Sequence, residues 1–172
     1  MITGVHIAET ATNSGLIGTP YKKLDCQALV EEVLKRAGLK IPNYRGSNHM
    51  WRDLVYDRTA TAEKAPLPGT LAFIVKNDGG EVKRGYHDSM GNASHVAIVL
   101  DEKTVFESTT GGVQYGKMSR FNYWAKIKDV EYTTGGAEDA GAGPSFIETL
   151  KTYMNIIRDN LDEMERFINE YQ

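Results

Sequence analysis

Residues 21–39, YKKLDCQALVEEVLKRAGL, are the stretch that decides the fold class of this chain. Their apolar residues recur every three or four positions, which predicts an amphipathic helix over residues 26–37. Asp25 is the expected N-cap, and Gly38 occupies the position where glycine often ends a helix. Cys26 therefore falls in the first turn, where the helix dipole favours a thiolate, although a buried cysteine acting as a small apolar residue fits the same position.

The rest of the first 132 residues predicts further helices and then strands. Short helices are expected at residues 5–16 and 47–55, and strands at residues 71–75, 95–100, 104–108 and 126–132. A tight turn at residues 101–103 would join two of these strands. Residues 111–117, GGVQYGK, lack the final Ser or Thr of a phosphate-binding loop, and we interpret them as a glycine-rich connection. The expected class is α+β, with N-terminal helices packed on an antiparallel sheet.

The composition is that of an ordinary globular protein, with 41% of the 172 residues hydrophobic and 25% charged. A formal net charge of −3 provides no basic surface, so no nucleic-acid partner is expected. The single cysteine excludes an internal disulfide framework and a multi-cysteine zinc site, and we expect no metal or cofactor. The apolar runs are too short to cross a bilayer and no signal peptide is visible, so no membrane insertion is expected.

A cysteine nucleophile needs a base, which makes the histidines the next candidates. His95 opens the apolar strand HVAIVL after a polar loop, so its ring could face a cleft, although a structural histidine is the plainer interpretation. His87, in the preceding loop, is the fallback base. Glu107 lies on the next predicted strand and would orient the His95 ring if residues 101–103 form the turn; an exposed strand glutamate is the alternative.

Three stretches carry a family resemblance: residues 21–39, residues 65–75 (APLPGTLAFIV) and residues 94–109 (SHVAIVLDEKTVFEST). Together they resemble the NlpC-type cell-wall peptidases, a papain-like cysteine peptidase family. In that family a Gly-x-Pro-Tyr segment precedes an Asp-Cys pair, a Pro-Gly turn starts a strand, and a histidine strand is followed by a third polar residue. The matching positions here are Gly18, Pro20, Tyr21, Asp25, Cys26, Pro68, Gly69, His95 and Glu107.

The resemblance implies a papain-like peptidase domain over residues 1–132 that cleaves amide bonds of peptidoglycan stem peptides without a cofactor. His95 would take the proton of Cys26, the thiolate would attack the amide carbonyl, and Glu107 would orient the imidazole. Without a visible signal peptide, the expected setting is a phage or prophage lytic enzyme, made in the cytoplasm and released to the bacterial wall.

The same resemblance implies two substrate-binding roles. The Tyr21 hydroxyl would contact the oxyanion or the substrate, and Asp25 would bind the free amine of a stem peptide as well as cap the helix. Departures from the family pattern include Gln27 and Ala28 in place of Ser-Gly and Thr70 in place of aspartate, and they leave open a non-catalytic papain-like binding or assembly module. The other alternative is a CHAP-like N-acetylmuramoyl-L-alanine amidase with the same Cys-His pair.

The composition changes near residue 133. Residues 133–145, TTGGAEDAGAGPS, predict a flexible linker. Residues 146–172 predict one helix whose apolar residues keep a heptad spacing, namely Ile147, Leu150, Met154, Ile157, Leu161, Met164, Ile168 and Tyr171. The helix could fold back on its own domain, but the linker gives no reason to hold it there. We therefore expect a coiled-coil homo-oligomer formed through residues 146–172.

Light scattering is expected to show that the full chain is a homo-oligomer. A version of the chain that ends at residue 135 is expected to be a monomer. An apolar stripe on a 3.5-residue repeat drifts around a straight helix unless helices supercoil together. Replacing Ile157 and Leu161, at the middle of the stripe, by Asp should give monomers. A full-length chain that is monomeric at micromolar concentration would contradict this prediction and favour a helix packed on its own domain.

Overall fold

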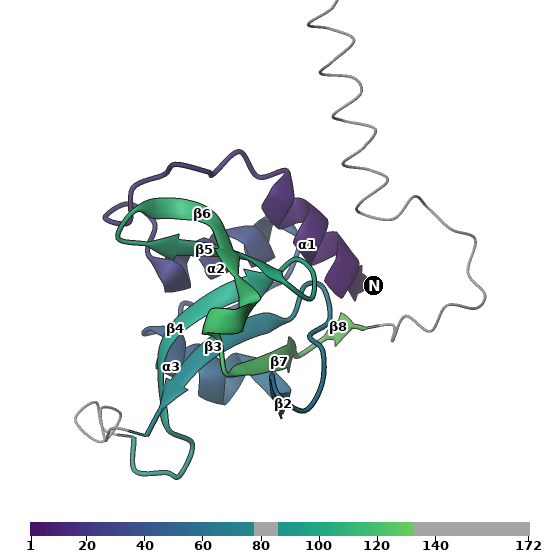
Figure 1. Ribbon diagram of the computed structural model, residues 1–172. Helices are drawn as coiled ribbons and strands as arrows, with labels where there is room; N and C mark the ends of the chain where they lie inside the picture. The colour runs from purple at the N-terminus through teal and green to yellow at the C-terminus, as the bar shows by residue number, and fades with distance from the viewer. Residues whose placement is uncertain (78–85, 133–172) are drawn as a thin grey trace, which may run out of the picture. The chain divides into compact units, whose positions relative to one another are not determined.

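The computed structural model describes residues 1–77 and 86–132 (Figure 1). The chain divides into two units, Met1–Thr134 and Gly135–Gln172, and every described residue belongs to the first unit. The linker and the helix predicted from residue 133 onward lie outside the described residues.

Most helical segments come before most strands along the chain, as the sequence predicts. The helical segments are α1 (Gly4–Thr12), α2 (Cys26–Arg36), α3 (Ser47–His49), the π-helical turn η1 (Met50–Leu54) and the 3₁₀ turn η2 (Met118–Arg120). The strands are β1 (Ile2–Thr3), β2 (Val55–Ala60), β3 (Leu71–Lys76), β4 (Asn92–Val99), β5 (Thr104–Thr109), β6 (Gly112–Lys117), β7 (Tyr123–Ile127) and β8 (Val130–Glu131). The α+β class expected from the sequence is confirmed.

Six strands form one antiparallel sheet in the order β2-β7-β3-β4-β5-β6, and β1 pairs separately with β8 in parallel. Helix α2 packs against β4 and β5, and α3 packs against β4 (Figure 1). Strands β4 and β5 pair with Ile98 opposite Phe106, which fixes where the polar residues of these two strands meet.

Helix α2 has the ends and the buried face that the sequence predicts. The Asp25 side chain caps it by accepting a hydrogen bond from the backbone N–H of Ala28. Gly38 follows the helix with φ +91°, the left-handed conformation that ends many helices. Its fully buried side chains are Leu29, Val30, Val33 and Leu34. The apolar stripe therefore holds the first turn of α2 at a fixed place on the sheet.

Buried side chains on the two faces of the sheet belong to two separate hydrophobic cores. The core that contains α2 also contains Val96, Ile98 and Phe106. The second, smaller core contains Ala97, Val99, Val105, Phe121 and Trp124. Because side chains alternate along a strand, His95 and Glu107 belong to the second face.

Three local expectations are wrong in detail. The helix expected at residues 47–55 is α-helical only over Ser47–His49, where the Ser47 hydroxyl donates to the carbonyl oxygen of Ala93 at 2.5 Å, and Met50–Leu54 form the π-helical turn η1. The strand expected at residues 126–132 is interrupted between β7 and β8, where Asp129 adopts φ +62°. The glycine-rich residues 112–117, expected to be a connection, form the strand β6. They pair along their whole length with β5, and this pairing is a tertiary contact that their own side chains do not predict.

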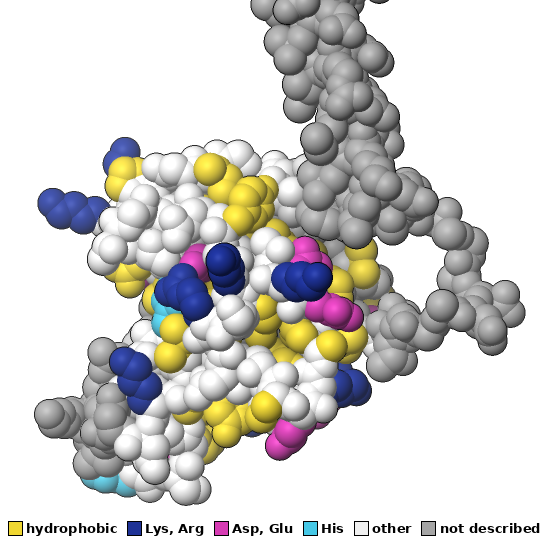
Figure 2. Space-filling view, in the orientation of Figure 1, with side chains coloured by type: hydrophobic (Ala, Val, Ile, Leu, Met, Phe, Trp, Pro, Cys, Tyr) yellow, Lys and Arg dark blue, Asp and Glu magenta, His cyan; other side chains and the backbone are white. Residues whose placement is uncertain are grey.

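The face shown in Figure 2 carries Lys and Arg side chains dispersed among polar and apolar ones, with acidic side chains beside some of them. Ion pairs of the described residues include Arg36 with Glu32 and Lys126 with Asp57, both at 2.8 Å. Within residues 1–77 and 86–132, no helix is long and apolar enough to cross a membrane.

Gly69 occupies a turn that only glycine fits. Its φ is +75°, and a Cβ atom there would overlap the carbonyl oxygen of Gly4 at the start of α1. Its N–H donates to the carbonyl oxygen of Val99 at 2.8 Å. The turn therefore brings the N-terminus of α1 directly against the connection into β3.

Gly69→Ala is expected to lower the free energy of unfolding by more than Gly15→Ala does. Gly15 has φ +68° with open space around it, so an alanine there meets only the left-handed penalty of about 1–2 kcal/mol. At Gly69 the steric overlap with backbone adds about 1–3 kcal/mol. Denaturant unfolding of both variants measures the difference, and equal losses would contradict the close packing described here.

Candidate active site

Cys26 is the first residue of α2, and only 8% of its surface is exposed. The Asp25 Oδ1 atom accepts a hydrogen bond from the Ala28 N–H at 2.8 Å, which fixes the first turn. The carbonyl oxygen of Leu24 accepts a hydrogen bond from the buried Ser108 hydroxyl on β5 at 2.5 Å. The thiol therefore stands at a helix N-terminus whose position relative to the sheet is fixed.

The loop before α2 is tied to the edge of the sheet. The Gly18 N–H donates to the carbonyl oxygen of Val113 and the Val113 N–H donates to that of Thr19, both at 2.9 Å, so the loop pairs with β6. This pairing places Tyr21 beside the thiol, and its hydroxyl donates to the Cys26 sulfur across 3.9 Å.

His95 lies on β4 between the thiol and a carboxylate. Its Nε2 atom is 2.8 Å from Oε2 of Glu107, and its ring also hydrogen-bonds to Cys26. Because Nε2 is engaged by Glu107, Nδ1 is the nitrogen left for the thiol. The ring stacks on Phe121, with centroids 5.6 Å apart and planes 28° apart. The ring is therefore held in the orientation that joins the two polar partners.

The strand register explains how Glu107 reaches His95. Ile98 lies opposite Phe106, and continuing this register by one residue on each strand sets Ala97 against Glu107. His95 is then the diagonal neighbour of Glu107, within reach of a long side chain.

A small residue makes room for the carboxylate. A Cβ atom at Gly116 on β6 would overlap Oε1 of Glu107. This same Oε1 accepts a hydrogen bond from Nη1 of Arg120 at 2.5 Å. The Glu107 side chain is 0% exposed and that of Arg120 is 48% exposed, so a buried carboxylate bridges His95 and Arg120.

The contacts shift the ionisation of all three groups. Burial raises the pKa of the Cys26 thiol, but hydrogen bonds to His95 and Tyr21 and the charge of His95 outweigh burial, so the pKa lies below its ordinary value. Burial lowers the pKa of His95, but hydrogen bonds to and the charges of Cys26 and Glu107 raise it to about 9. Burial raises the pKa of Glu107, but the hydrogen bonds to and the charges of His95 and Arg120 outweigh burial, so this pKa lies below its ordinary value. Between the thiol pKa and a pH of about 9, a thiolate stands beside an imidazolium.

Such an arrangement is chemically suited to nucleophilic acyl transfer. A thiol, an adjacent imidazole and a third group that orients the ring form the constellation that this chemistry requires. The first N–H groups of α2 lack acceptors within the helix and point toward the N-terminal end, where an oxyanion would develop. No cluster of three or more His, Cys, Asp or Glu side chains able to hold a metal ion occurs among the described residues.

The structure brings together Cys26, His95 and Glu107, and it places Tyr21 and Asp25 beside the thiol. His87, the fallback base, is exposed in the segment before β4. Sequence reasoning missed the residues that hold this group in place, namely Ser108, Gly116, Arg120 and Phe121. The last three follow from β6 and η2, which the sequence did not predict.

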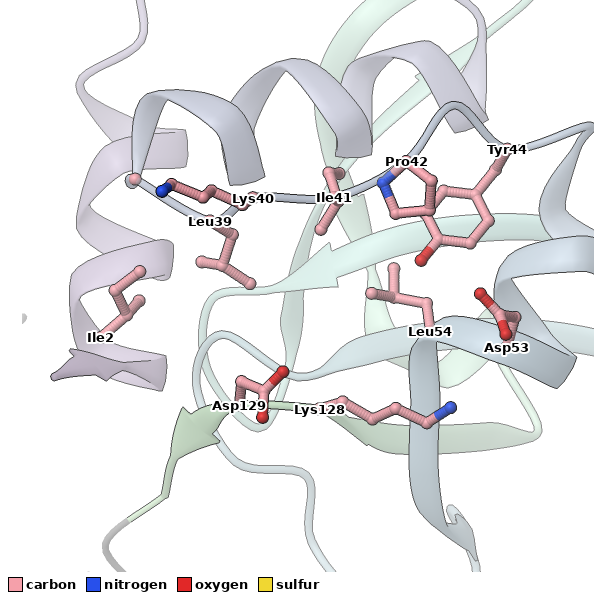
Figure 3. A pocket seen from close by; sticks show the side chains of 11 residues that line it. Ile2, Leu39, Lys40, Ile41, Pro42, Tyr44, Asp53, Leu54, Lys128 and Asp129 are labelled. Carbon is pink, nitrogen blue, oxygen red and sulfur yellow. The ribbon is translucent and has the colours of Figure 1, made fainter.

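A separate cavity of about 350 Å³ lies at the other end of α2 (Figure 3). Its lining includes four charged residues, Lys40, Asp53, Lys128 and Asp129, beside apolar side chains. Burial and the nearby Asp53 carboxylate raise the pKa of Tyr44 in this lining to about 12. The lining residues include no Cys, His or Ser, so they contain no nucleophile–base pair of the kind found at Cys26.

Residues 14–131 match the family model of the NlpC/P60 family, a span that includes Cys26, His95 and Glu107. Among solved structures, the chain is similar to a protein of Staphylococcus aureus subsp. aureus Mu50 described as similar to a lipoprotein of the NLP/P60 family. That similarity has a TM-score of 0.49 and 17% identity, and it covers 72% of this chain and 41% of the other. No curated protein matches the chain.

Alkylation of Cys26 by iodoacetamide is expected to proceed at pH values below the ordinary thiol range, because His95 and Tyr21 lower the thiol pKa. His95→Ala removes the main opposing partner and leaves burial, so the pKa should rise and the rate at pH 7 should fall at least about tenfold. Intact mass spectrometry over a pH series measures the rate. His87→Ala, at an exposed histidine, is the control and should leave the profile unchanged. Equal profiles for wild type and His95→Ala would contradict the thiolate–imidazolium pair.

Proposed function

The chain belongs to the NlpC/P60 family, and from this membership we propose that it is a cysteine peptidase that hydrolyses amide bonds in peptidoglycan stem peptides. Family membership supports a cell-wall peptidase-like function in general. The observation that carries the specific proposal is the continuous set of contacts from Cys26 through His95 to Glu107. We assign the thiol as nucleophile, the imidazole as base and acid, and the carboxylate as the group that orients the ring.

The first half of the proposed reaction forms a thioester. The Cys26 proton moves to Nδ1 of His95, and the thiolate attacks the carbonyl carbon of the scissile amide. The resulting oxyanion faces the first N–H groups of α2, with the Tyr21 hydroxyl beside the sulfur. The imidazolium then gives its proton to the leaving nitrogen, the C–N bond breaks, and the amine product departs.

The second half hydrolyses the thioester. His95 takes a proton from a water molecule, whose oxygen attacks the thioester carbonyl. The C–S bond breaks, the acid product leaves, and the thiolate is restored beside the imidazolium. Glu107 stabilises the positive ring in both halves, because its Oε2 lies 2.8 Å from Nε2.

Asp25 gives the proposal a substrate feature. The residue is exposed and directly precedes the nucleophile, and its capping bond uses only Oδ1. The carboxylate therefore supplies negative charge at the mouth of the site, where it would attract the free amine of a stem peptide. This is the role that resemblance to the family implies.

The departures from the family pattern fall on residues that build the fold, which favours catalysis over a non-catalytic binding module. Gln27 donates to the Glu31 carboxylate at 2.7 Å and to the carbonyl oxygen of Tyr44 at 2.9 Å. Thr70 is fully buried, and its hydroxyl donates to the carbonyl oxygen of Leu67 at 2.6 Å. Neither substitution removes a group that the proposed reaction uses.

Two further parts of the proposal concern where and in what form the protein acts. Release to the bacterial wall during phage lysis and assembly through residues 146–172 stay predictions from the sequence. Assembly would place several catalytic domains on one polymeric substrate and raise the effective affinity for it.

Purified peptidoglycan digested by the wild-type chain is expected to yield fragments with new amine termini inside the stem peptide, identified by mass spectrometry. Cys26→Ala and His95→Ala should each lower the rate at least about 1,000-fold, because the nucleophile and base act as a unit. His6→Ala, at an exposed histidine on α1, is the matched control and should keep the wild-type rate.

Stem peptides released intact from the sugar would instead identify the amidase. If a folded chain with a reactive thiol digests no peptidoglycan, both hydrolytic activities are contradicted. The non-catalytic binding module is then the favoured function.

A further inference from the structure

The mechanism above gives no role to Arg120, although this residue touches the buried carboxylate. Its Nη1 atom donates to Oε1 of Glu107 at 2.5 Å, while Oε2 of the same carboxylate lies 2.8 Å from Nε2 of His95. The carboxylate has no exposed surface, so its charge depends on these two partners.

The turn η2 holds Arg120 in this position through two buried neighbours, Met118 and Phe121. Met118 is 4% exposed, and its N–H donates to the carbonyl oxygen of Lys103 at 2.8 Å. Phe121 is 3% exposed and its carbonyl oxygen accepts a hydrogen bond from the Thr61 hydroxyl at 3.0 Å. Phe121 also stacks on the His95 ring, so one short segment supports both the ring and the carboxylate.

A buried carboxylate and an imidazole can share one proton in two ways. The proton can stay on the imidazole, giving an ion pair, or move to the carboxylate, giving two neutral groups. Burial favours the neutral pair, because it disfavours both charges. A cation bonded to the far oxygen of the carboxylate favours the ion pair, since it lies nearer to the carboxylate than to the ring.

We propose that Arg120 is a positioning residue that pairs with Glu107, keeps the shared proton on the His95 imidazole and thereby sustains the Cys26 thiolate. This role rests on the proposed function and deepens it, because a neutral imidazole would not stabilise the thiolate. The third position of the site is then an ion pair, Glu107 with Arg120, in place of a lone polar side chain.

Arg120→Gln tests this role by removing the charge while keeping a side chain that can donate a hydrogen bond. The midpoint of the pH profile for Cys26 alkylation should move upward, and the rate on its rising part should fall about three- to tenfold, which corresponds to at most about one pKa unit. Arg120→Lys keeps the charge and should restore most of the rate. On peptidoglycan, kcat should fall in Arg120→Gln while KM stays near the wild-type value.

Two controls separate this effect from general changes in charge and packing. Arg36→Gln removes an arginine that pairs with the half-exposed Glu32 far along α2, and its profile should match the wild type. In a Glu107→Gln background, Arg120→Gln should cause no further shift, because its effect passes through the carboxylate. Thermal unfolding of each variant verifies that the chain is folded.

An unchanged alkylation profile in folded Arg120→Gln would overturn the inference. An equal shift in Arg36→Gln would also overturn it, because the effect would then come from net charge. Equal shifts in Arg120→Gln and Arg120→Lys would overturn it as well, because the effect would then come from lost packing. Because alkylation needs no substrate, a wild-type chain with a reactive thiolate that digests no peptidoglycan would refute the proposed function and leave the role of Arg120 standing.

Discussion

The burial of one carboxylate, that of Glu107, is the constraint on which this half of the domain depends. An unpaired carboxylate without solvent costs several kcal/mol, so its neighbours must supply positive charge and hydrogen-bond donors. His95 occupies one oxygen and Arg120 the other. The space that the carboxylate needs is provided by Gly116, because a Cβ atom there would overlap Oε1 of Glu107. A single buried charge therefore constrains which residues can occupy positions on three neighbouring strands and in the turn η2.

The charges of the site alternate in sign from the nucleophile outward. The Cys26 thiolate lies beside the His95 imidazolium, which lies beside the Glu107 carboxylate, which lies beside the Arg120 guanidinium. Each group lies next to a group of opposite sign, and the N-terminus of α2 adds a partial positive charge at the sulfur end. Arg120 is the only one of the four with a largely exposed side chain, so water screens the outer end of the series while the inner end remains buried.

Sequence patterns predicted the parts of this site that depend on local order. The helix over α2, its Asp25 cap and the position of Cys26 follow from residues adjacent in the chain, and the hairpin that brings Glu107 to His95 follows from two apolar strands and a short turn. The strand β6 was not predicted in this way, because glycines at both ends of its short Val-Gln-Tyr alternation weaken the strand pattern and its pairing comes from β5. Since Gly116 belongs to β6 and Arg120 comes directly after it, the missed strand also hid the second partner of the carboxylate. A buried charge is neutralised by partners that come from distant parts of the chain. The local periodicity of the sequence does not predict such partners.

The pleat of β5 explains how one strand can position both halves of a nucleophile–base pair. Adjacent residues of a strand point to opposite faces, and Glu107 and Ser108 are adjacent. Glu107 points to the face that holds His95, whereas the Ser108 hydroxyl reaches the carbonyl oxygen of Leu24 just before the nucleophile helix. A shift of β5 by one residue would exchange these faces and break both contacts together. The register set by Ile98 and Phe106 therefore fixes the ring and the helix N-terminus at once, so the distance between thiol and imidazole is a property of the sheet more than of the loops around it.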